Sequence, residues 1–321
     1  MPLIEKPNYY HPFFMFNGHI QTIIPAIFRL VDTLPFERER INTPDGDFLD
    51  LDWLRNGSRH LVIISHGLEG NSRRPYMSGM AKIFMTQGYD VLTWNFRGCS
   101  EEINLKPFFY HSGATYDLQT VIDHAAPDYD DISLIGFSLG GNLTLKYLGE
   151  PHRCSPKIRK AVTISVPLDL ASSCHKISSK ENLIYSQRFL KTLKLKIQLK
   201  GAKYPDLLSL EHLIHVNTMR DFDDFYTGPL HGFQNAKDYY TQCSSIHFLP
   251  YIRIPTLVLN AKNDPFLSPE CYPHALGKEL EYIFMEFPEH GGHVGFSPRR
   301  RKDVYWSEKR AWEFIHFENY A

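Results

Sequence analysis

The sequence predicts an α/β protein with a mostly parallel, doubly wound sheet. From residue 60 onward, short apolar runs alternate with longer segments of helical periodicity, which is typical of helices packed on both faces of a parallel sheet. The run "HLVIISH" (60–66) is almost continuously apolar, as buried parallel strands are. The sequence contains no internal repeat, low-complexity tract or flexible linker. We therefore expect a single domain over residues 1–321.

The elements follow one another in a regular order. Residues 37–54 predict an antiparallel hairpin around the turn "PDGD". The first helix after the hairpin has a proline at its start and Gly88 just past its end, as helix termini commonly do. The expected strands are 60–66, 90–96, 131–137, 159–167, 254–261 and 280–287. The expected helices are 75–88, 115–126, 139–148 and 303–317.

One long insertion interrupts this order. Nearly ninety residues separate the strands at 159–167 and 254–261, far more than a simple crossover requires, so we expect an inserted helical cap or lid at 168–250. Within it, residues 193–200 alternate like a strand, but the spacing of Leu190, Leu193 and Ile197 favours a helix. The five lysines of 190–203 indicate a solvated face of the cap or, alternatively, peripheral contact with a membrane surface.

Composition excludes several classes of function. The 35 basic and 36 acidic residues give a net charge of −1, which offers no electrostatic footprint for nucleic acid. No apolar run approaches the ~20 residues of a membrane-spanning helix, and the first residues lack the pattern of a signal peptide. The five cysteines are scattered, without C-x-x-C spacing, so we expect reduced thiols, no zinc site and a cytoplasmic protein.

The segment "LIGFSLGGNLTLKYL" (134–148) contains a G-x-S-x-G pattern around Ser138. The pattern follows an expected buried strand and opens an expected helix, which is the context of a nucleophile elbow. Gly136 and Gly140 flank the serine, Gly140 and Gly141 would keep the approach to it open, and the helix N-terminus would place positive charge near a developing oxyanion. These features favour a nucleophilic serine over a passive turn residue.

A serine hydroxyl needs a base, and the base needs an orienting acid. In this type of sheet the expected chain order is Ser, acid, His. Asp264 follows the strand at 254–261, and His293 follows the strand at 280–287. Both therefore fall at the carboxyl edge of the sheet, where open α/β folds bind ligands.

Both assignments have alternatives in the sequence. Asp169, after the strand at 159–167, could supply the acid, and His290, three residues before His293, could supply the base. The spacing of the two histidines could also be half of a metal site, but no third ligand is evident. We expect neither a metal nor a cofactor.

Two backbone N–H groups are candidates for an oxyanion hole. One is that of Leu139, the residue after the serine, and the other should come from the loop after the first central strand. That loop reads "SHGLEGNS", which makes the N–H of Leu68 the natural second donor.

Several sequence blocks together resemble one family. "HGLEGNSRRPY", "NFRGCSEEIN", "YHSG", "GFSLGGN", "NAKNDPF" and "HGGHVGF" look like the YheT-like branch of the α/β-hydrolase superfamily, as do "NGHIQTIIPAIFR", "FDDFYTGPLHGF" and "YYTQCS". The resemblance covers nearly the whole chain. It implies an α/β-hydrolase fold and a serine hydrolase, in most members an esterase that acts on carboxylic esters.

By motif, the family's nucleophile, acid and base fall on Ser138, Asp264 and His293. The chain departs from the family at one position, because the family often has Asp-Asp-Pro where this chain has Asn263-Asp264-Pro265. We take the second of these residues as the acid, since it keeps the usual distance to the proline.

The leading hypothesis is a carboxylic-ester hydrolase that works through an acyl-enzyme on a small-molecule or lipid ester of short to medium acyl chain. An acyltransferase would differ only in the alcohol that replaces water. A C–C or peptide hydrolase, or a non-catalytic protein that binds a small ligand under its cap, remain alternatives. The aromatic segment "YYHPFFMF" (9–16) either lines an apolar site or packs against the body.

Overall fold

The computed structural model describes residues 3–4, 7–151, 154–300 and 303–317. It forms a sheet of nine described strands in the order β1-β9-β8-β7-β6-β4-β5-β3-β2. All neighbours pair in parallel except β2–β3 and β3–β5. The strands are β1 (Leu3–Ile4), β2 (Glu37–Asn42), β3 (Phe48–Leu54), β4 (His60–Ser65), β5 (Asp90–Trp94), β6 (Asp131–Phe137), β7 (Ile158–Ile164), β8 (Thr256–Leu259) and β9 (Ile283–Glu286).

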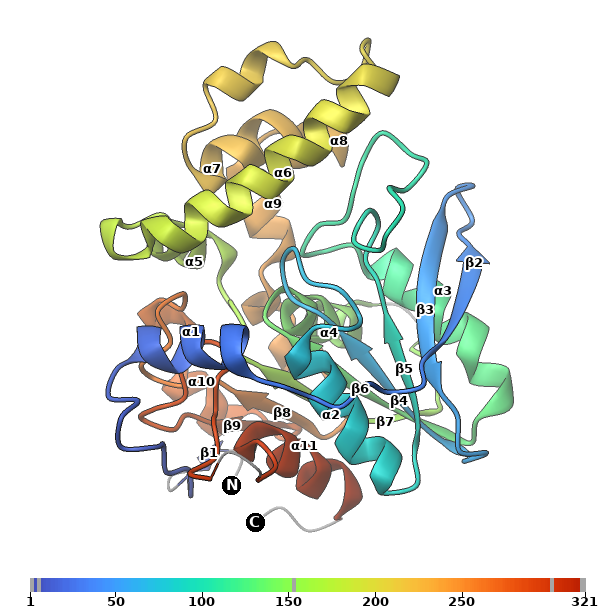
Figure 1. Cartoon of the computed structure of the whole chain (residues 1–321), viewed down its shortest axis with the longest axis vertical. Coiled ribbons are helices and arrows are strands. Elements are labelled where there is room, and N and C mark those ends of the chain that lie inside the picture. Colours follow the sequence, from blue (N-terminus) through green and yellow to red (C-terminus); the bar gives the residue numbers. More distant parts are fainter. Residues whose placement is uncertain (1–2, 5–6, 152–153, 301–302, 318–321) are drawn as a thin grey trace.

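Helices cover both faces of the sheet, and a further group lies beyond one end of it (Figure 1). The fold is the expected α/β-hydrolase arrangement, with a mostly parallel sheet. The helices are α1 (Gly18–Phe28), α2 (Pro75–Thr86), α3 (Thr115–Ala125), α4 (Leu139–Gly149), α5 (Leu170–Ile177), α6 (Leu183–Lys203), α7 (Met219–Phe222), α8 (Gly228–Leu230), α9 (Ala236–Cys243), α10 (His274–Glu279) and α11 (Trp306–His316).

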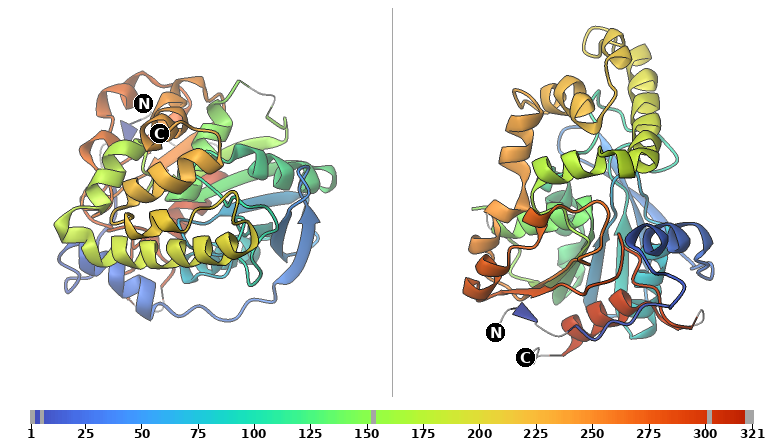
Figure 2. Two further views of the ribbon diagram at one scale, coloured as in Figure 1. Left: turned by 90° about the horizontal axis from the view of Figure 1, so that it is seen from above. Right: turned by 90° about the vertical axis from the view of Figure 1, so that its left-hand side faces the viewer.

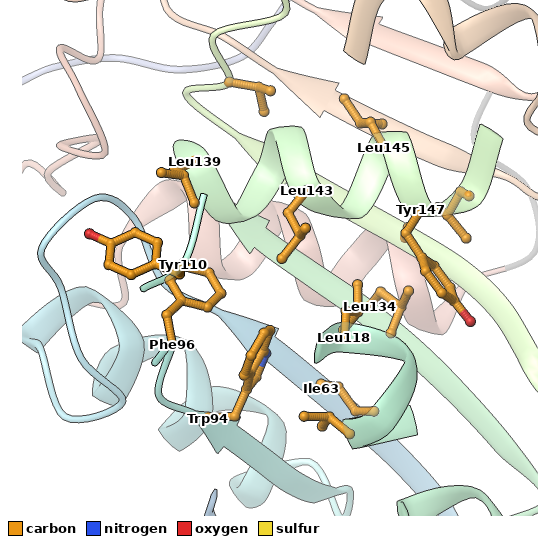
Figure 3. Packing of buried hydrophobic residues seen from close by; sticks show 14 of the residues in the cluster. Ile63, Trp94, Phe96, Tyr110, Leu118, Leu134, Leu139, Leu143, Leu145 and Tyr147 are labelled. Atoms are coloured by element: carbon orange, nitrogen blue, oxygen red, sulfur yellow. The ribbon is translucent and has the colours of Figure 1, made fainter. Parts of the chain in front are cut away.

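The core consists of two apolar layers, one on each face of the sheet. Along β4, Leu61 and Ile63 point into one layer while Val62 and Ile64 point into the other, as the two-residue period of a strand requires. The first layer packs against α3 and α4, and Figure 3 shows Ile63 there beside residues of both helices. The second packs against α2 and α11. Burial on both faces explains the continuous apolar runs of the central strands.

The expected elements are confirmed, but β4, β5, β7, β8 and β9 end earlier or are shorter than the expected ranges. β7 ends at Ile164 because Ser165 turns the chain with a φ of 55°. β8 and β9 are four residues each. The sequence did not predict α1, which has Pro25 inside it. The predicted domain ends, residues 1 and 321, lie outside the described residues.

We refer to residues 168–250 as the cap segment. It contains α5 to α9, which lie together at one end of the molecule (Figures 1 and 2). The ambiguous stretch 193–200 is part of the 21-residue helix α6, as the helical spacing predicted. Among the described residues, no helix combines the length and apolar character needed to cross a membrane.

The lysines of α6 do not form one solvated face. Lys200 is buried, and its Nζ donates to the carbonyl oxygens of Asn104, at 2.5 Å, and Lys106. Lys196 Nζ lies 2.6 Å from Glu69 Oε1, in the loop after β4. Two of the five lysines therefore hold α6 against the body instead of facing solvent or a membrane.

Candidate active site

Ser138 stands on a strained turn between β6 and α4. Its φ of 53° and ψ of −116° lie outside the regions that residues other than glycine usually adopt. The neighbouring glycines make this turn possible. A Cβ on Gly136 would lie 2.4 Å from the carbonyl oxygen of Gly140, and a Cβ on Gly140 would lie 2.5 Å from that of His66. The close approach of three backbone segments thus explains the glycine pattern around Ser138.

The structure brings Asp264 and His293 together. His293 Nδ1 lies 2.8 Å from Asp264 Oδ2, and Asp264 is buried. Because an ionised carboxylate can only accept, Nδ1 carries the proton, which leaves Nε2 as an acceptor. Asp264 is itself fixed by the backbone N–H of Phe266, whose ring packs against His293 at a centroid distance of 4.4 Å.

Helix α1 holds the loop that carries His293. Thr22 Oγ1 accepts a hydrogen bond from the backbone N–H of His293 at 2.8 Å. Gln21 Oε1 accepts from Asn263 Nδ2 at 2.9 Å, and Asn263 Oδ1 accepts from Gly292 N–H at 3.0 Å. Asn263 therefore binds the backbone of the loop at Gly292, whereas Asp264 contacts the side chain of His293. The sequence did not predict the roles of Gln21 and Thr22. The family-like block "NGHIQTIIPAIFR", which contains both, was the only feature that pointed to this segment.

The two alternative residues point elsewhere. Asp169 caps the N-terminus of α5, and its Oδ1 accepts from the backbone N–H of Ser172 at 2.8 Å. The ring of His290 lies against that of His11, tilted by 56° with centroids 4.1 Å apart, and burial together with that neighbour lowers the pKa of His290. Neither residue contacts the Asp264–His293 pair.

The two candidate oxyanion donors lie in the wall of one cavity together with Ser138. The N–H groups of Gly67 and Glu69 donate to tyrosine hydroxyls at 3.0 and 2.8 Å. The N–H of Leu68, between them, donates to no group in the described part of the chain. Leu139 is the first residue of α4, where backbone N–H groups have no intrahelical partner.

Polar contacts hold the loop that carries Leu68 from the sheet side and from the cap side. His66 Nδ1 lies 2.7 Å from the carbonyl oxygen of Gly67, and its Nε2 accepts from the backbone N–H of Phe96 at 3.1 Å. Burial lowers the pKa of His66 to about 3, so its ring stays neutral. On the cap side, Lys196 of α6 forms an ion pair with Glu69.

The cavity has a volume of about 410 Å³, and Ser138 and His293 both line it. Apolar side chains dominate its walls, for example Ile23 of α1, Ile177 of α5 and Phe189 of α6. None of residues 9–16 lines it, and Phe13 is 91% exposed. Residues 9–16 therefore do not line the apolar cavity, whereas residues of α1 do.

Comparisons with known proteins identify the family of the chain. Residues 60–298 match the family model described as alpha/beta hydrolase fold. The Escherichia coli protein YheT is 35% identical over 87% of this chain and 84% of its own length. Phospholipase ABHD3 of Homo sapiens is 28% identical over 92% of this chain and 75% of its own length. Monoacylglycerol lipase of Saccharomyces cerevisiae is 29% identical over 83% of this chain and 60% of its own length.

Solved structures support the same fold. An esterase of Pyrococcus furiosus superposes with a TM-score of 0.57 at 20% identity, covering 89% of this chain and 95% of its own. At that identity the likeness concerns the fold, whereas the sequence relatives carry the enzyme class. The chain belongs to the α/β-hydrolase fold family, in its YheT-like branch, and is a carboxylic-ester hydrolase.

Proposed function

We propose that the chain cleaves carboxylic esters through an acyl-enzyme on Ser138, with His293 as general base and Asp264 as the acid that orients it. The observation that carries the proposal is the 2.8 Å contact between His293 and Asp264 beside the cavity that Ser138 also lines. A nucleophile on a strained turn, a base and a buried acid in this order suit acyl transfer.

The steps follow from these positions. His293 Nε2 takes the proton of the Ser138 hydroxyl as Oγ bonds to the ester carbonyl carbon. The tetrahedral intermediate then expels the alcohol, which receives that proton. Water repeats the sequence on the acyl-enzyme, giving up a proton to His293 and releasing the carboxylic acid and free Ser138. Transfer to a second alcohol would differ only in this acceptor.

The N–H groups of Leu68 and Leu139 are proposed to stabilise the oxyanion. Removing one such donor typically costs about 10²–10³ in turnover. Backbone donors cannot be deleted by side-chain substitution, so the rigidity of the loop matters. His66 and Glu69, which flank Leu68, are the groups that hold it.

The substrate class follows from the cavity. A volume of about 410 Å³ falls within the range of small-molecule sites, and its apolar walls suit a short to medium acyl chain of a small-molecule or lipid ester. We further propose that residues 168–250 act as a cap within a single domain. The five scattered cysteines suit a reducing cytoplasmic location.

Covalent labelling tests the proposal. A fluorophosphonate probe should modify Ser138 and no other serine, and Ser138→Ala should lower turnover by on the order of 10⁶. His293→Ala should abolish hydrolysis of aryl esters from acetyl to palmitoyl, while His290→Ala serves as the matched control and keeps most of the activity. Unlabelled Ser138 in active protein, or an active His293→Ala beside an inactive His290→Ala, would overturn the mechanism.

A further inference from the structure

The block "FDDFYTGPLHGF" (222–233) has no part in the proposed mechanism, yet it borders the cavity. It contains a π-helical turn, Asp223–Thr227, between α7 and α8. Turns of this kind are rare and occur frequently at functional sites. The first residue of the turn, Asp223, lines the same cavity as Ser138.

Asp223 also lines a smaller cavity of about 50 Å³. The two cavities share several wall residues, among them Leu68, Leu139 and Tyr239. Asp223 therefore lies on the wall common to both, at the cap side of the space into which a substrate bound at Ser138 would extend.

The surroundings of Asp223 leave its carboxyl group incompletely satisfied. Tyr240 Oη donates to Asp223 Oδ2 at 2.6 Å, and the Thr227 hydroxyl gives further support. No lysine, arginine or histidine among the described residues forms an ion pair with it. Burial raises the pKa of Asp223 to about 6. A carboxylate offers about four acceptor positions, and two hydroxyl groups do not fill them.

We propose that Asp223 forms a polar subsite that binds a hydroxyl group carried by the ester substrate, away from the ester bond. The inference rests on the proposed function and specifies its substrate class. Asp223 is half-buried and borders the cavity, so an ester that fills the cavity would remove water from its remaining acceptor positions. Loss of that water without a replacement is costly, and a hydroxyl on the ester would replace it. A hydroxyl also suits both protonation states of the carboxyl group, because it can donate to the ionised form and accept from the neutral one.

Matched substrates provide the test. One series consists of p-nitrophenyl esters of linear acids from hexanoyl to dodecanoyl, each compared with its ω-hydroxy and ω-methoxy counterparts. A second series consists of butyrate esters of linear alcohols, compared with those of the corresponding diols. The two series distinguish a hydroxyl on the acyl side from one on the alcohol side. The methoxy compounds keep the oxygen but lack the donor.

The readout is the ratio of kcat/KM for hydroxylated and plain ester within one protein, which cancels differences in active enzyme. In the wild type we expect a preference for the hydroxyl of at least tenfold at one chain length in one series, since sites that bind a substrate hydroxyl discriminate strongly. Asp223→Leu should bring the ratio close to one. The matched control is Asp224→Asn, because Asp224 is the next residue of the same turn and accepts from the backbone N–H of Ala236 without lining either cavity.

The outcomes separate this inference from the proposed function. Cleavage of plain esters without any hydroxyl preference in either series overturns the subsite alone, and this result needs no variant. A preference that survives in Asp223→Leu, or that the methoxy compounds share, also overturns it. Loss of the ratio in Asp223→Leu but not in Asp224→Asn supports it. If Ser138→Ala cleaves all of these esters as fast as the wild type, the proposed function itself fails.

Discussion

Helices α4 and α6 both border the cavity, but different forces hold them. All eleven residues of α4 are buried, whereas six of the 21 residues of α6 are. Apolar packing on the sheet therefore fixes the helix that follows Ser138. α6 depends more on specific polar contacts, such as Lys196 with Glu69 and Lys200 with two backbone carbonyls. The proposed nucleophile therefore lies in the tightly packed part of the molecule, whereas the helix on the cap side of the cavity is held by a few specific polar contacts.

The sharpest test of this division compares two aspartates, one in each region. Asp264→Asn should lower turnover by on the order of 10⁴ with the fold intact, because the amide can donate to His293 Nδ1 and no longer fixes the tautomer that leaves Nε2 as the base. Asp169→Asn, at the start of the cap segment, should stay near wild-type activity, since asparagine caps a helix as well as aspartate does. Steady-state kinetics on an aryl ester and circular dichroism measure both effects. The reverse result would move the acid to Asp169.

The contact between the two regions should have a smaller effect. Lys196→Met removes the cation beside Glu69, whose side chain is 8% exposed. We expect the free energy of unfolding to fall by roughly 1–3 kcal/mol, less than the roughly 3–5 kcal/mol lost when one partner of a fully buried ion pair is removed. We also expect about a tenfold loss in kcat/KM, since Glu69 adjoins Leu68. Urea denaturation and kinetics check both. The exposed Lys191→Met is the control, and the double variant Glu69→Gln/Lys196→Met should recover stability. Equal losses in both lysine variants would disprove the coupling.

The last expected effect concerns acid stability at neutral-to-acid pH and leaves the stability at pH 7 nearly unchanged. Burial lowers the pKa of His231, in the cap segment, to about 4, whereas an unfolded histidine titrates near 6.5. Below about pH 6.5 the unfolded chain therefore binds a proton that the folded chain does not, so the free energy of unfolding falls as the pH is lowered toward 4. His231→Phe should reduce this slope by up to about 1.4 kcal/mol per pH unit.

Urea unfolding between pH 7 and pH 4.5 measures the slope. His175→Phe, at an exposed position of α5, should leave it unchanged. A slope that is the same in His231→Phe and in the wild type would show that His231 does not contribute to acid sensitivity.

Much of the body could be predicted from the sequence because its signals are local. The turn at Ser138 has its glycines within two residues, and the strands before Asp264 and His293 are visible as apolar runs. The contacts that position these groups were not predictable. Gln21 and Thr22 accept hydrogen bonds from a loop about 270 residues away in the sequence. The hydrophobic periodicity of one segment carries no information about contacts with such a distant segment.

The lysine pattern of α6 predicted a solvated face, and this was wrong for Lys196 and Lys200 because their partners lie far away in the sequence. Lysines on a helix usually face solvent, and nothing around Lys200 in the sequence indicates that carbonyl groups of the loop near residue 105 surround it. Asp223 likewise looks like one of two ordinary acidic residues. Only the fold shows that one of them lines the cavity and the other caps a helix.

The docking of α1 on the histidine loop has a consequence for how activity arises during synthesis. α1 leaves the ribosome long before the loop 288–296 that it holds. Arg29, directly after α1, also pairs with Glu308 of α11, so two segments that are synthesised far apart in time are fastened to each other. Under the proposed mechanism, a nascent chain that already displays Ser138 stays chemically silent. Under the same mechanism, the order of translation itself would keep unfinished protein from cleaving esters.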